Sequence, residues 1–182
     1  MKQAFFLDRD GVINVEVDYL SDPDKAELIP GVPEALREIH AHGFLAIVVT
    51  NQSGVARGMY TQNEVNAVHR RIDELLAAAG AKVDGWYFCP HHPKHTGPCD
   101  CRKPAPGMLL QAAREHEIDL ANSVMVGDRL SDLEAGRAAG CRTVWLIKTG
   151  YGAEVVRTTD LTGVNVAEDL ADAVRRTFAG EA

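Results

Sequence analysis

A short apolar run that ends abruptly in charged residues places the strongest constraint on this chain. Residues Ala4–Leu7 are apolar, which predicts a buried strand, and Asp8, Arg9, Asp10 and Gly11 follow at once. Ligands of an open parallel sheet bind just beyond the carboxyl ends of its strands. Two carboxylates this close together repel each other unless a cation or a reacting group lies between them. The motif therefore predicts a catalytic or magnesium-binding pair.

Two other structures use the same residue types. Asp-Gly after a strand is common in hairpin turns, but no alternating strand follows Gly11 directly. A calcium-binding EF-hand loop has acidic or amide residues at alternate positions and glycine at the sixth, where this chain has Val12 and Ile13 at positions five and six. Neither template fits the stretch.

Apolar runs and amphipathic segments alternate along the rest of the chain. Strands are expected at residues 44–50, 83–88, 123–126, 143–147 and 164–166. Helices are expected at residues 32–42, after a Thr61/Glu64 capping box, and at 106–117, 133–139 and 169–178. The segments 14–30 and 89–101, and the Gly-rich stretch between residues 147 and 164, are expected to be loops.

Strands that alternate with helices imply right-handed βαβ units and a parallel sheet covered on both faces. The predicted fold class is therefore α/β, a doubly wound parallel sheet with small loop insertions and no large cap domain. No repeat, low-complexity segment or linker divides the chain, so residues 1–182 are expected to form one domain.

The charge balance excludes several classes of partner. The 182 residues include 26 acidic and 19 basic side chains, a net charge of −7, which argues against a general binder of nucleic acid or anionic membranes. The apolar run that precedes Asp8 has only four residues, and no apolar run is long enough to span a bilayer. We expect a cytoplasmic protein without a nucleic-acid or membrane partner.

Candidate catalytic and metal-binding residues lie at the carboxyl ends of three of the predicted strands. Asp8 and Asp10 follow the first, Thr50 ends the second, and Asp128 follows the strand at 123–126, while Lys103 precedes a helix. They converge only if these strands are parallel neighbours. Taken alone, Thr50 would be an ordinary β-branched strand residue and Lys103 a solvated lysine.

Asp132 has two interpretations that the sequence leaves open. It or Ser131 could be the N-cap of the following helix. Alternatively, Asp132 could orient the groups around a metal ion without binding the ion itself.

The cysteine pattern predicts a second metal site. Cys89-x-His91 is followed, after seven residues, by Cys99-x-Cys101. Three thiolates and an imidazole form a closed tetrahedral set of the structural zinc type, and a Cys99–Cys101 disulfide would close a very short loop. Three other residues of these types are not expected to bind metal: His92 and His95, taken as exposed, and Cys141, taken as an inert buried thiol.

Four motifs resemble those of the haloacid-dehalogenase (HAD) superfamily of phosphotransferases. They are DRDG (8–11), VVTN (48–51), RKP (102–104) and GDRLSD (127–132), and they occur in the order of that superfamily. The resemblance covers nearly the whole chain. CPHHP, CDCRKP and PGMLL, with DRDGVIN and TNQSGVARG, are similar to the D-glycero-D-manno-heptose 1,7-bisphosphate 7-phosphatase family, whose near relative is the histidinol-phosphate phosphatase family.

The resemblance implies a role for each catalytic residue. Asp8 attacks phosphorus and becomes an aspartyl phosphate, and Asp10 protonates the leaving oxygen and then activates water. Thr50 donates to a phosphoryl oxygen, and Lys103 offsets its charge. Mg²⁺ is held by the side chains of Asp8 and Asp128 and by the backbone carbonyl of Asp10.

The same resemblance implies substrate contacts from nine residues: Glu16, Val17, Asp18, Tyr19, Asn51, Gln52, Ser53, Arg102 and Arg129. Zinc would fold the loop that carries Arg102, whose forked guanidinium suits a second phosphate. The loop between His91 and Cys99 is shorter than in some members of the family, and Arg129 replaces a lysine.

The expected function is that of a Mg²⁺-dependent phosphatase, a monomer acting on a small phosphorylated sugar. It would remove the C7 phosphate of heptose 1,7-bisphosphate to give heptose 1-phosphate, a precursor for nucleotide-activated heptose and lipopolysaccharide.

A histidinol-phosphate phosphatase, or another small sugar-phosphate phosphatase, is the alternative. A phospho-acceptor signalling domain is a hypothesis of another class, although Asp10 suits hydrolysis rather than a long-lived phosphoaspartate. A third hypothesis is a module that binds nucleic acid through its zinc loop, and the net negative charge of the chain argues against it.

Overall fold

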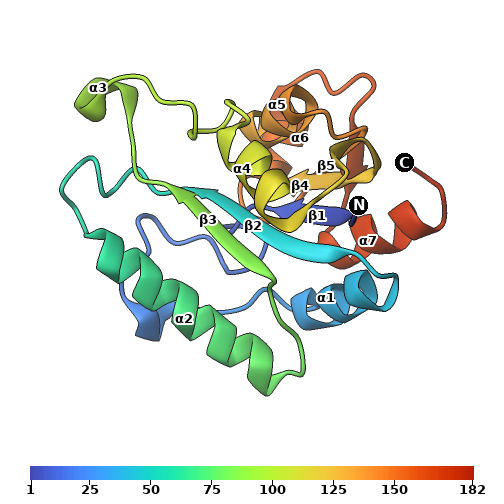
Figure 1. Ribbon diagram of the computed structural model, residues 1–182, viewed down its shortest axis with the longest axis horizontal. Coiled ribbons are helices and arrows are strands. Elements are labelled where there is room, and N and C mark those ends of the chain that lie inside the picture. The colour runs from blue at the N-terminus through green and yellow to red at the C-terminus, as the bar shows by residue number, and fades with distance from the viewer.

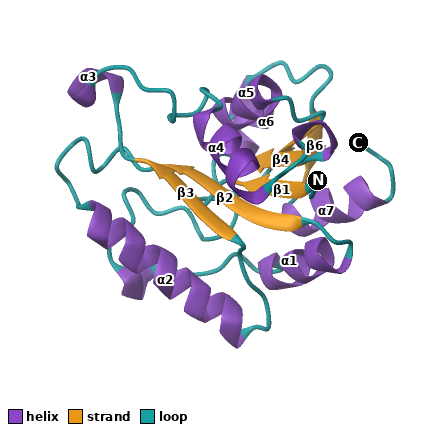
Figure 2. Ribbon diagram, in the orientation of Figure 1, coloured by secondary structure: helices purple, strands orange, loops and turns teal.

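The computed structural model describes residues 1–182 and contains one six-stranded sheet. All neighbouring strands are parallel, in the order β3-β2-β1-β4-β5-β6 (Figures 1 and 2). The strands are β1 (Ala4–Leu7), β2 (Leu45–Asn51), β3 (Gly85–Cys89), β4 (Val124–Gly127), β5 (Thr143–Ile147) and β6 (Asn165–Ala167). The α/β fold class predicted from the sequence is confirmed.

Helices cover both faces of the sheet (Figure 1). One face packs against α1 (Val32–Ala41), α2 (Gln62–Ala78) and α7 (Leu170–Phe178). The other packs against α4 (Gly107–His116), α5 (Leu130–Ala139) and α6 (Gly152–Thr158). Successive strand residues supply the two cores in turn, because side chains alternate across a sheet. In β1, for example, Phe5 and Leu7 belong to the first core and Phe6 to the second.

The strand order reverses between β1 and β4. The chain builds β1, β2 and β3 outward in one direction and then crosses to β4 on the other side of β1. Leu7 at the end of β1 pairs with Val48 of β2 and with Val126 of β4. The residues that follow these three strands therefore meet at one edge, at the position where open α/β sheets bind ligands.

Two α-helices were not predicted, besides the short 3-10 helices at Pro23–Lys25 and Leu120–Asn122. One is α3 (Pro93–Thr96) inside the loop 89–101, and the other is α6, which occupies part of the stretch interpreted as a Gly-rich loop. The loop prediction for residues 152–158 was wrong because glycine was taken only as a chain breaker. Gly152 instead permits close packing, since a Cβ atom there would collide with the carbonyl of Ile147.

The remaining elements agree with the predictions to within a few residues. The capping box of α2 forms, with Thr61 and Glu64 each accepting a hydrogen bond from the backbone N–H of the other. Helix α5 begins at Leu130, one turn before the predicted start. None of the helices combines the length and apolar character needed to cross a bilayer.

Candidate active site

A cavity of about 540 Å³ opens at the carboxyl edge of the sheet. Its lining includes all the residues predicted for catalysis and substrate contact: Asp8, Asp10, Glu16, Val17, Asp18, Tyr19, Thr50, Asn51, Gln52, Ser53, Arg102, Lys103 and Arg129. Asp128, predicted as a metal ligand, is fully buried beside this cavity. Segments far apart in the sequence thus form one concave surface.

Three buried carboxylates form the base of the site. One oxygen from each of Asp8, Asp128 and Asp132 lies within 4.8 Å of the other two. Asp128 Oδ2 accepts a hydrogen bond from the N–H of Tyr151 at 2.8 Å, whereas Asp128 Oδ1 is buried without any hydrogen-bond partner. A buried, unpartnered carboxylate oxygen within an all-oxygen cluster suits a hard divalent cation such as Mg²⁺.

Two glycines allow the backbone to approach this cluster. Gly11 (φ +81°) and Gly150 (φ +55°) lie next to each other against Asp128, and a Cβ atom on either would collide with its carboxylate. Thr149 Oγ1 donates to the carbonyl of Gly11 at 2.6 Å and ties the two turns together. Two adjoining main-chain turns therefore pack against the Asp128 carboxylate, which limits its freedom to reorient.

The electrostatics of the cluster favour bound protons or a bound cation. Burial raises the pKa of Asp8 to about 6, against the lowering effect of Lys103. Burial, together with the charge of Asp8, raises the pKa of Asp128 to about 8. Without a metal ion, these two carboxyl groups therefore take up protons near neutral pH.

Lys103 is buried, not the solvated lysine that its position alone would suggest. It is 3% exposed, and its Nζ lies 2.9 Å from Asp8 Oδ1 and 2.7 Å from Asp132 Oδ1. Burial alone would lower the pKa of Lys103, but the charges of Asp132 and Asp8 raise it. Nζ also donates to the carbonyl of Val49 at 2.8 Å. Lys103 therefore holds the side chain of Asp8 in place.

Asp132 combines parts of both interpretations. The N-cap of α5 is Arg129, so the prediction that Ser131 or Asp132 caps the helix was wrong in position. Asp132 nevertheless accepts the backbone N–H of Arg129 at 3.0 Å through Oδ2, while its other oxygen contacts Lys103. One carboxylate thus connects the start of α5 to the reactive centre.

Asp10 is held as a carboxylate by three neighbours. Arg9, which is fully buried, donates from Nε at 3.2 Å and from Nη2 to both Asp10 oxygens at 2.9 Å. Asn14 and Gln52 each donate at 3.0 Å. Burial alone would raise the pKa of Asp10, but the charge of Arg9 and these hydrogen bonds lower it. An ionised Asp10 is suited to accept a proton from water.

The side chains of two predicted substrate contacts form hydrogen bonds within the protein. Asn51 donates to the carbonyl of Lys103 and accepts its N–H, both at 3.0 Å. Gln52 donates to Asp10 and to Thr50 Oγ1, and accepts from the hydroxyl of Tyr60 at 2.8 Å. The hydroxyl proton of Thr50 is left free for another acceptor.

Three arginines line the mouth of the cavity without a carboxylate partner. Arg57 Nη2 lies 3.2 Å from His92 Nε2, and Arg102 donates to the carbonyl of His91 at 3.3 Å. Arg129 lies over the ring of Tyr151. Because all these contacts are with uncharged groups, the three positive charges remain available to an anionic ligand.

Sequence reasoning missed several of the residues that build the site. Arg9 and Asn14 hold Asp10, and Arg57, Tyr60 and Tyr151 line the cavity. For Arg9 a signal was present, since an arginine between two aspartates directly after a buried strand needs a buried partner. No comparable sequence signal marks Tyr60 or Tyr151.

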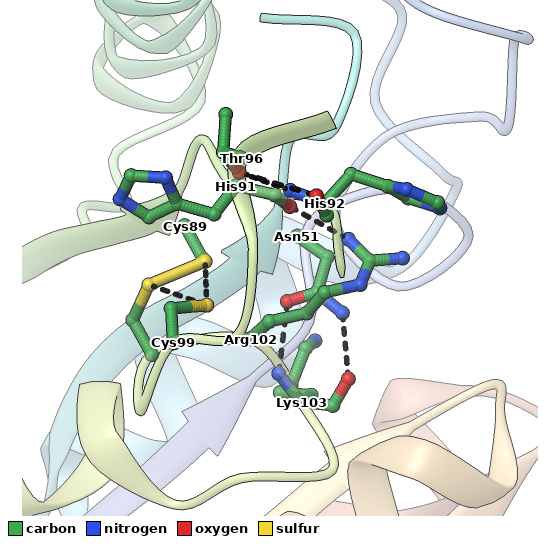
Figure 3. Close-up of a disulfide and its surroundings, with 9 residues drawn as sticks. Asn51, Cys89, His91, His92, Thr96, Cys99, Arg102 and Lys103 are labelled. Atoms are coloured by element: carbon green, nitrogen blue, oxygen red, sulfur yellow. Dashed lines mark hydrogen bonds between the residues drawn. A yellow bond between two sulfur atoms is a disulfide. The ribbon is translucent and has the colours of Figure 1, made fainter. Parts of the chain in front are cut away.

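The three cysteines of the loop 89–101 converge, as Figure 3 shows. Cys89 and Cys101 form a disulfide, with their Cα atoms 5.5 Å apart, and Cys99 has a free sulfur 3.6 Å from that of Cys89 and 3.7 Å from that of Cys101. The three sulfur atoms nevertheless lie close enough to share one ion, and zinc ligation by this loop stays a prediction. From the sequence, only a Cys99–Cys101 disulfide was considered. The structure pairs Cys101 with Cys89 because the loop returns to the end of β3.

The histidines of this loop differ from the expectation. His91 is not among the residues whose ligand atoms lie within 4.8 Å of one another, although its ring lies on the side of the sulfurs and that of His92 points away (Figure 3). His95 is exposed, but His92 is only half-exposed and contacts Arg57. Cys141 is a buried free thiol, as predicted.

Comparisons with known proteins agree with this geometry. The HAD-hydrolase-like family model matches residues 100–173. The D-glycero-beta-D-manno-heptose-1,7-bisphosphate 7-phosphatases of Yersinia pestis and Escherichia coli K12 are 47% and 43% identical to this chain. The match covers 81% of both chains for the former, and 95% of this chain and 94% of the relative for the latter. The chain belongs to the heptose 1,7-bisphosphate phosphatase family of HAD-like hydrolases.

A solved member of this heptose bisphosphate phosphatase family has the same fold. The D,D-heptose 1,7-bisphosphate phosphatase of B. bronchiseptica, crystallised with magnesium and phosphate, superposes with a TM-score of 0.88 at 39% identity over the full length of both chains. The predicted family is confirmed, and with it the prediction of a phosphoric monoester hydrolase.

We predict that Mg²⁺ binding releases protons and weakens as the pH falls from about 8 to about 6. The raised pKa values of Asp128 and Asp8 mean that a cation must displace protons, so the Mg²⁺ affinity should fall about tenfold per pH unit for each proton displaced. Calorimetry in buffers of different ionisation enthalpy measures this release. Asp128→Asn should abolish it, and Asp160→Asn, an exposed control, should retain it. A Mg²⁺ affinity independent of pH would contradict the prediction.

Proposed function

We propose that this enzyme hydrolyses the C7 phosphate of D-glycero-D-manno-heptose 1,7-bisphosphate and releases heptose 1-phosphate for nucleotide-activated heptose synthesis. One observation carries the proposal: a single cavity contains a buried carboxylate cluster at its base and three unpaired arginines at its mouth. A substrate with a phosphate at each end fits this arrangement, with one phosphate at the carboxylate cluster and the other at the arginines. The same proposal takes the enzyme to act as a monomer in the cytoplasm.

In the first step, the Asp8 carboxylate attacks the C7 phosphorus and forms an aspartyl phosphate as the bond to the sugar oxygen breaks. Asp10 gives that oxygen its proton. Asp10 is ionised in the substrate-free site, but a phosphate beside it adds negative charge and raises its affinity for a proton. Lys103 and the free hydroxyl proton of Thr50 offset charge on the phosphoryl oxygens.

In the second step, water attacks the phosphorus of the aspartyl phosphate, and Asp10 takes the proton of that water. The first step leaves Asp10 as the carboxylate that Arg9, Asn14 and Gln52 hold by hydrogen bonds, and the proton it takes here leaves it protonated, so it gives that proton to solvent or to the next leaving oxygen. Phosphate leaves and Asp8 is restored. The fixed position of Asp10 serves both steps, because proton transfer depends on distance and orientation.

Asp8 and Asp128 would hold Mg²⁺ with their side chains, and Asp10 with its backbone carbonyl. The unpartnered oxygen of Asp128 supports this set of ligands. When bound, the ion supplies positive charge that neutralises the transferring phosphoryl group. The crystallised B. bronchiseptica relative contains magnesium and phosphate.

The remote phosphate would bind at the mouth of the cavity. Arg102 and Arg129 are the proposed partners, because neither is neutralised by a carboxylate. The loop of Glu16–Tyr19 would contact the sugar between the two phosphates, as expected from its place in the lining. Asn51 and Gln52 would act by positioning Lys103 and Asp10 rather than through the substrate.

Zinc would stabilise the cysteine loop once the Cys89–Cys101 bond is reduced. The three sulfur atoms already lie close enough to share one ion, and His91 is the proposed fourth ligand. Such a site would be structural, because four protein ligands leave no position for water. It would fix the loop that leads into Arg102 and Lys103.

The proposed function predicts a marked substrate preference. We expect kcat/KM for a heptose 1,7-bisphosphate to exceed that for histidinol phosphate by about 10- to 100-fold, the worth of one or two charge-assisted hydrogen bonds. A phosphate-release assay with the α and β anomers and histidinol phosphate measures it. Comparable turnover of histidinol phosphate would overturn the substrate proposal but not the chemistry.

Asp8→Asn should lower kcat by at least about 10³-fold, because an amide does not form the aspartyl phosphate. The variant should stay folded, since Asn keeps a side-chain oxygen that can accept the backbone N–H of Arg9. Thermal unfolding and acid-quenched mass spectrometry of the Asp8 peptide check both points, with Asp160→Asn as the control. Substantial remaining turnover would show that another residue is the nucleophile.

Reduction in the presence of Zn²⁺ should load about one zinc ion per chain and raise Tm, because metal binding is coupled to folding of the loop. Elemental analysis and thermal unfolding measure these effects. Cys99→Ala should lose the zinc, whereas Cys141→Ala, which lies outside the cluster, should keep it. Zinc content unaffected by Cys99→Ala would contradict the proposed ligands.

A further inference from the structure

A tyrosine outside every motif of the sequence connects three parts of the site. Tyr151 follows β5 and lines the cavity. Its backbone N–H donates to Asp128 Oδ2 at 2.8 Å, and its hydroxyl donates to Asp18 Oδ1 at 3.2 Å. Its ring centre lies 3.7 Å from the guanidinium carbon of Arg129. One residue therefore contacts the buried carboxylate cluster, the loop 14–30 and a cation of the cavity mouth.

The backbone of Tyr151 is fixed by its two glycine neighbours. A Cβ atom on Gly150 would collide with the Asp128 carboxylate, and one on Gly152 would collide with the carbonyl of Ile147. The turn between them is thus packed closely against the base of the site. The side chain of Tyr151 extends from this fixed base towards the solvent, where it is half-buried.

The ring of Tyr151 positions Arg129 without neutralising it. An aromatic face attracts a guanidinium through its quadrupole and leaves the charge and the N–H donors available to an anion. A carboxylate in the same place would compete with a phosphate for the guanidinium. Arg129 has no carboxylate partner, and it lines the same cavity as Arg102.

The hydroxyl of Tyr151 links two sides of the cavity. Asp18 belongs to the loop between β1 and α1, and Tyr151 to the turn between β5 and α6. The nearby Tyr19 has φ +55°, a conformation that is rare for a residue with a side chain and that gives this part of the loop a defined shape. In a fold without a large cap domain, a bond between these two segments helps to define the entrance.

We propose that Tyr151 is a specificity-determining residue that presents Arg129 to the second phosphate of the substrate. Its hydroxyl ties the loop of Asp18 to the opposite side of the entrance. The inference rests on the proposed function, because it requires a substrate with a phosphate at each end. Tyr151 acts through Arg129 and does not touch the reacting phosphorus.

The experiment compares heptose 1,7-bisphosphate with heptose 7-phosphate, which differ only in the remote phosphate. Tyr151→Leu should raise KM for the bisphosphate about 3- to 10-fold more than KM for the monophosphate, within the range of a cation–π contact. Tyr151→Phe keeps the aromatic ring and should therefore keep the wild-type ratio of the two KM values. Tyr87→Phe removes a tyrosine hydroxyl outside the cavity, where it bonds to Glu115, and serves as the matched control.

A double-mutant cycle separates positioning from a general structural effect. If Tyr151 acts through Arg129, Tyr151→Leu should add no further loss of bisphosphate preference in an Arg129→Gln background. Additive losses, or an equal rise of both KM values in Tyr151→Leu, would overturn the inference. Thermal unfolding of each variant shows that the comparison is made on folded protein, and if the leucine variant unfolds, a Tyr151→Phe ratio that departs from the wild-type ratio would still overturn the inference.

The controls also separate this inference from the proposed function. A wild-type enzyme that does not prefer the bisphosphate to the monophosphate would refute the proposed function, and the inference with it. A wild-type preference that Tyr151→Leu leaves intact would refute only the role of Tyr151.

Discussion

The buried contact between Lys103 and the carboxylates of Asp8 and Asp132 is the interaction on which the rest of the site depends. With Asp128 beside them, three carboxylates and one ammonium are removed from water, which leaves an excess of negative charge. Such a cluster is costly unless a cation or bound protons complete it. The requirement for a divalent ion is thus a consequence of charge burial, and the transferring phosphate benefits from the same positive charge.

The parallel sheet makes this concentration of charge feasible. Because β2 and β4 both neighbour β1, their carboxyl ends bring Thr50 and Asp128 to Asp8. The close turns at Gly11 and Gly150 then pack against Asp128, and Asn51 holds the backbone of Lys103. Elsewhere the same cavity is lined by three arginines that are held by uncharged partners, together with Glu16 and Asp18.

The sequence predicted the elements whose physical signals are local. Apolar runs located the strands, and the acidic residues that follow them located the carboxylate cluster. It could not predict α6, because glycine marks close packing as well as chain breaks, and it could not show that the side chain of Gln52 donates to Asp10. Tyr151 was missed because its contacts with Asp18 and Arg129 exist only after β5 is placed beside β4. The pairing of Cys89 with Cys101 likewise depends on how the loop returns.

The central claim is that Asp8 and Asp128 share one cation beside the phosphorus that Asp8 attacks. The most direct measurement is a crystal structure of the enzyme with Mg²⁺ and beryllium fluoride, which mimics a phosphoryl group on a carboxylate. The account predicts one ion bonded to both side chains, with the fluoride group on Asp8 and in contact with Lys103 and Thr50. An ion bound away from Asp128, or a fluoride group on another residue, would contradict it.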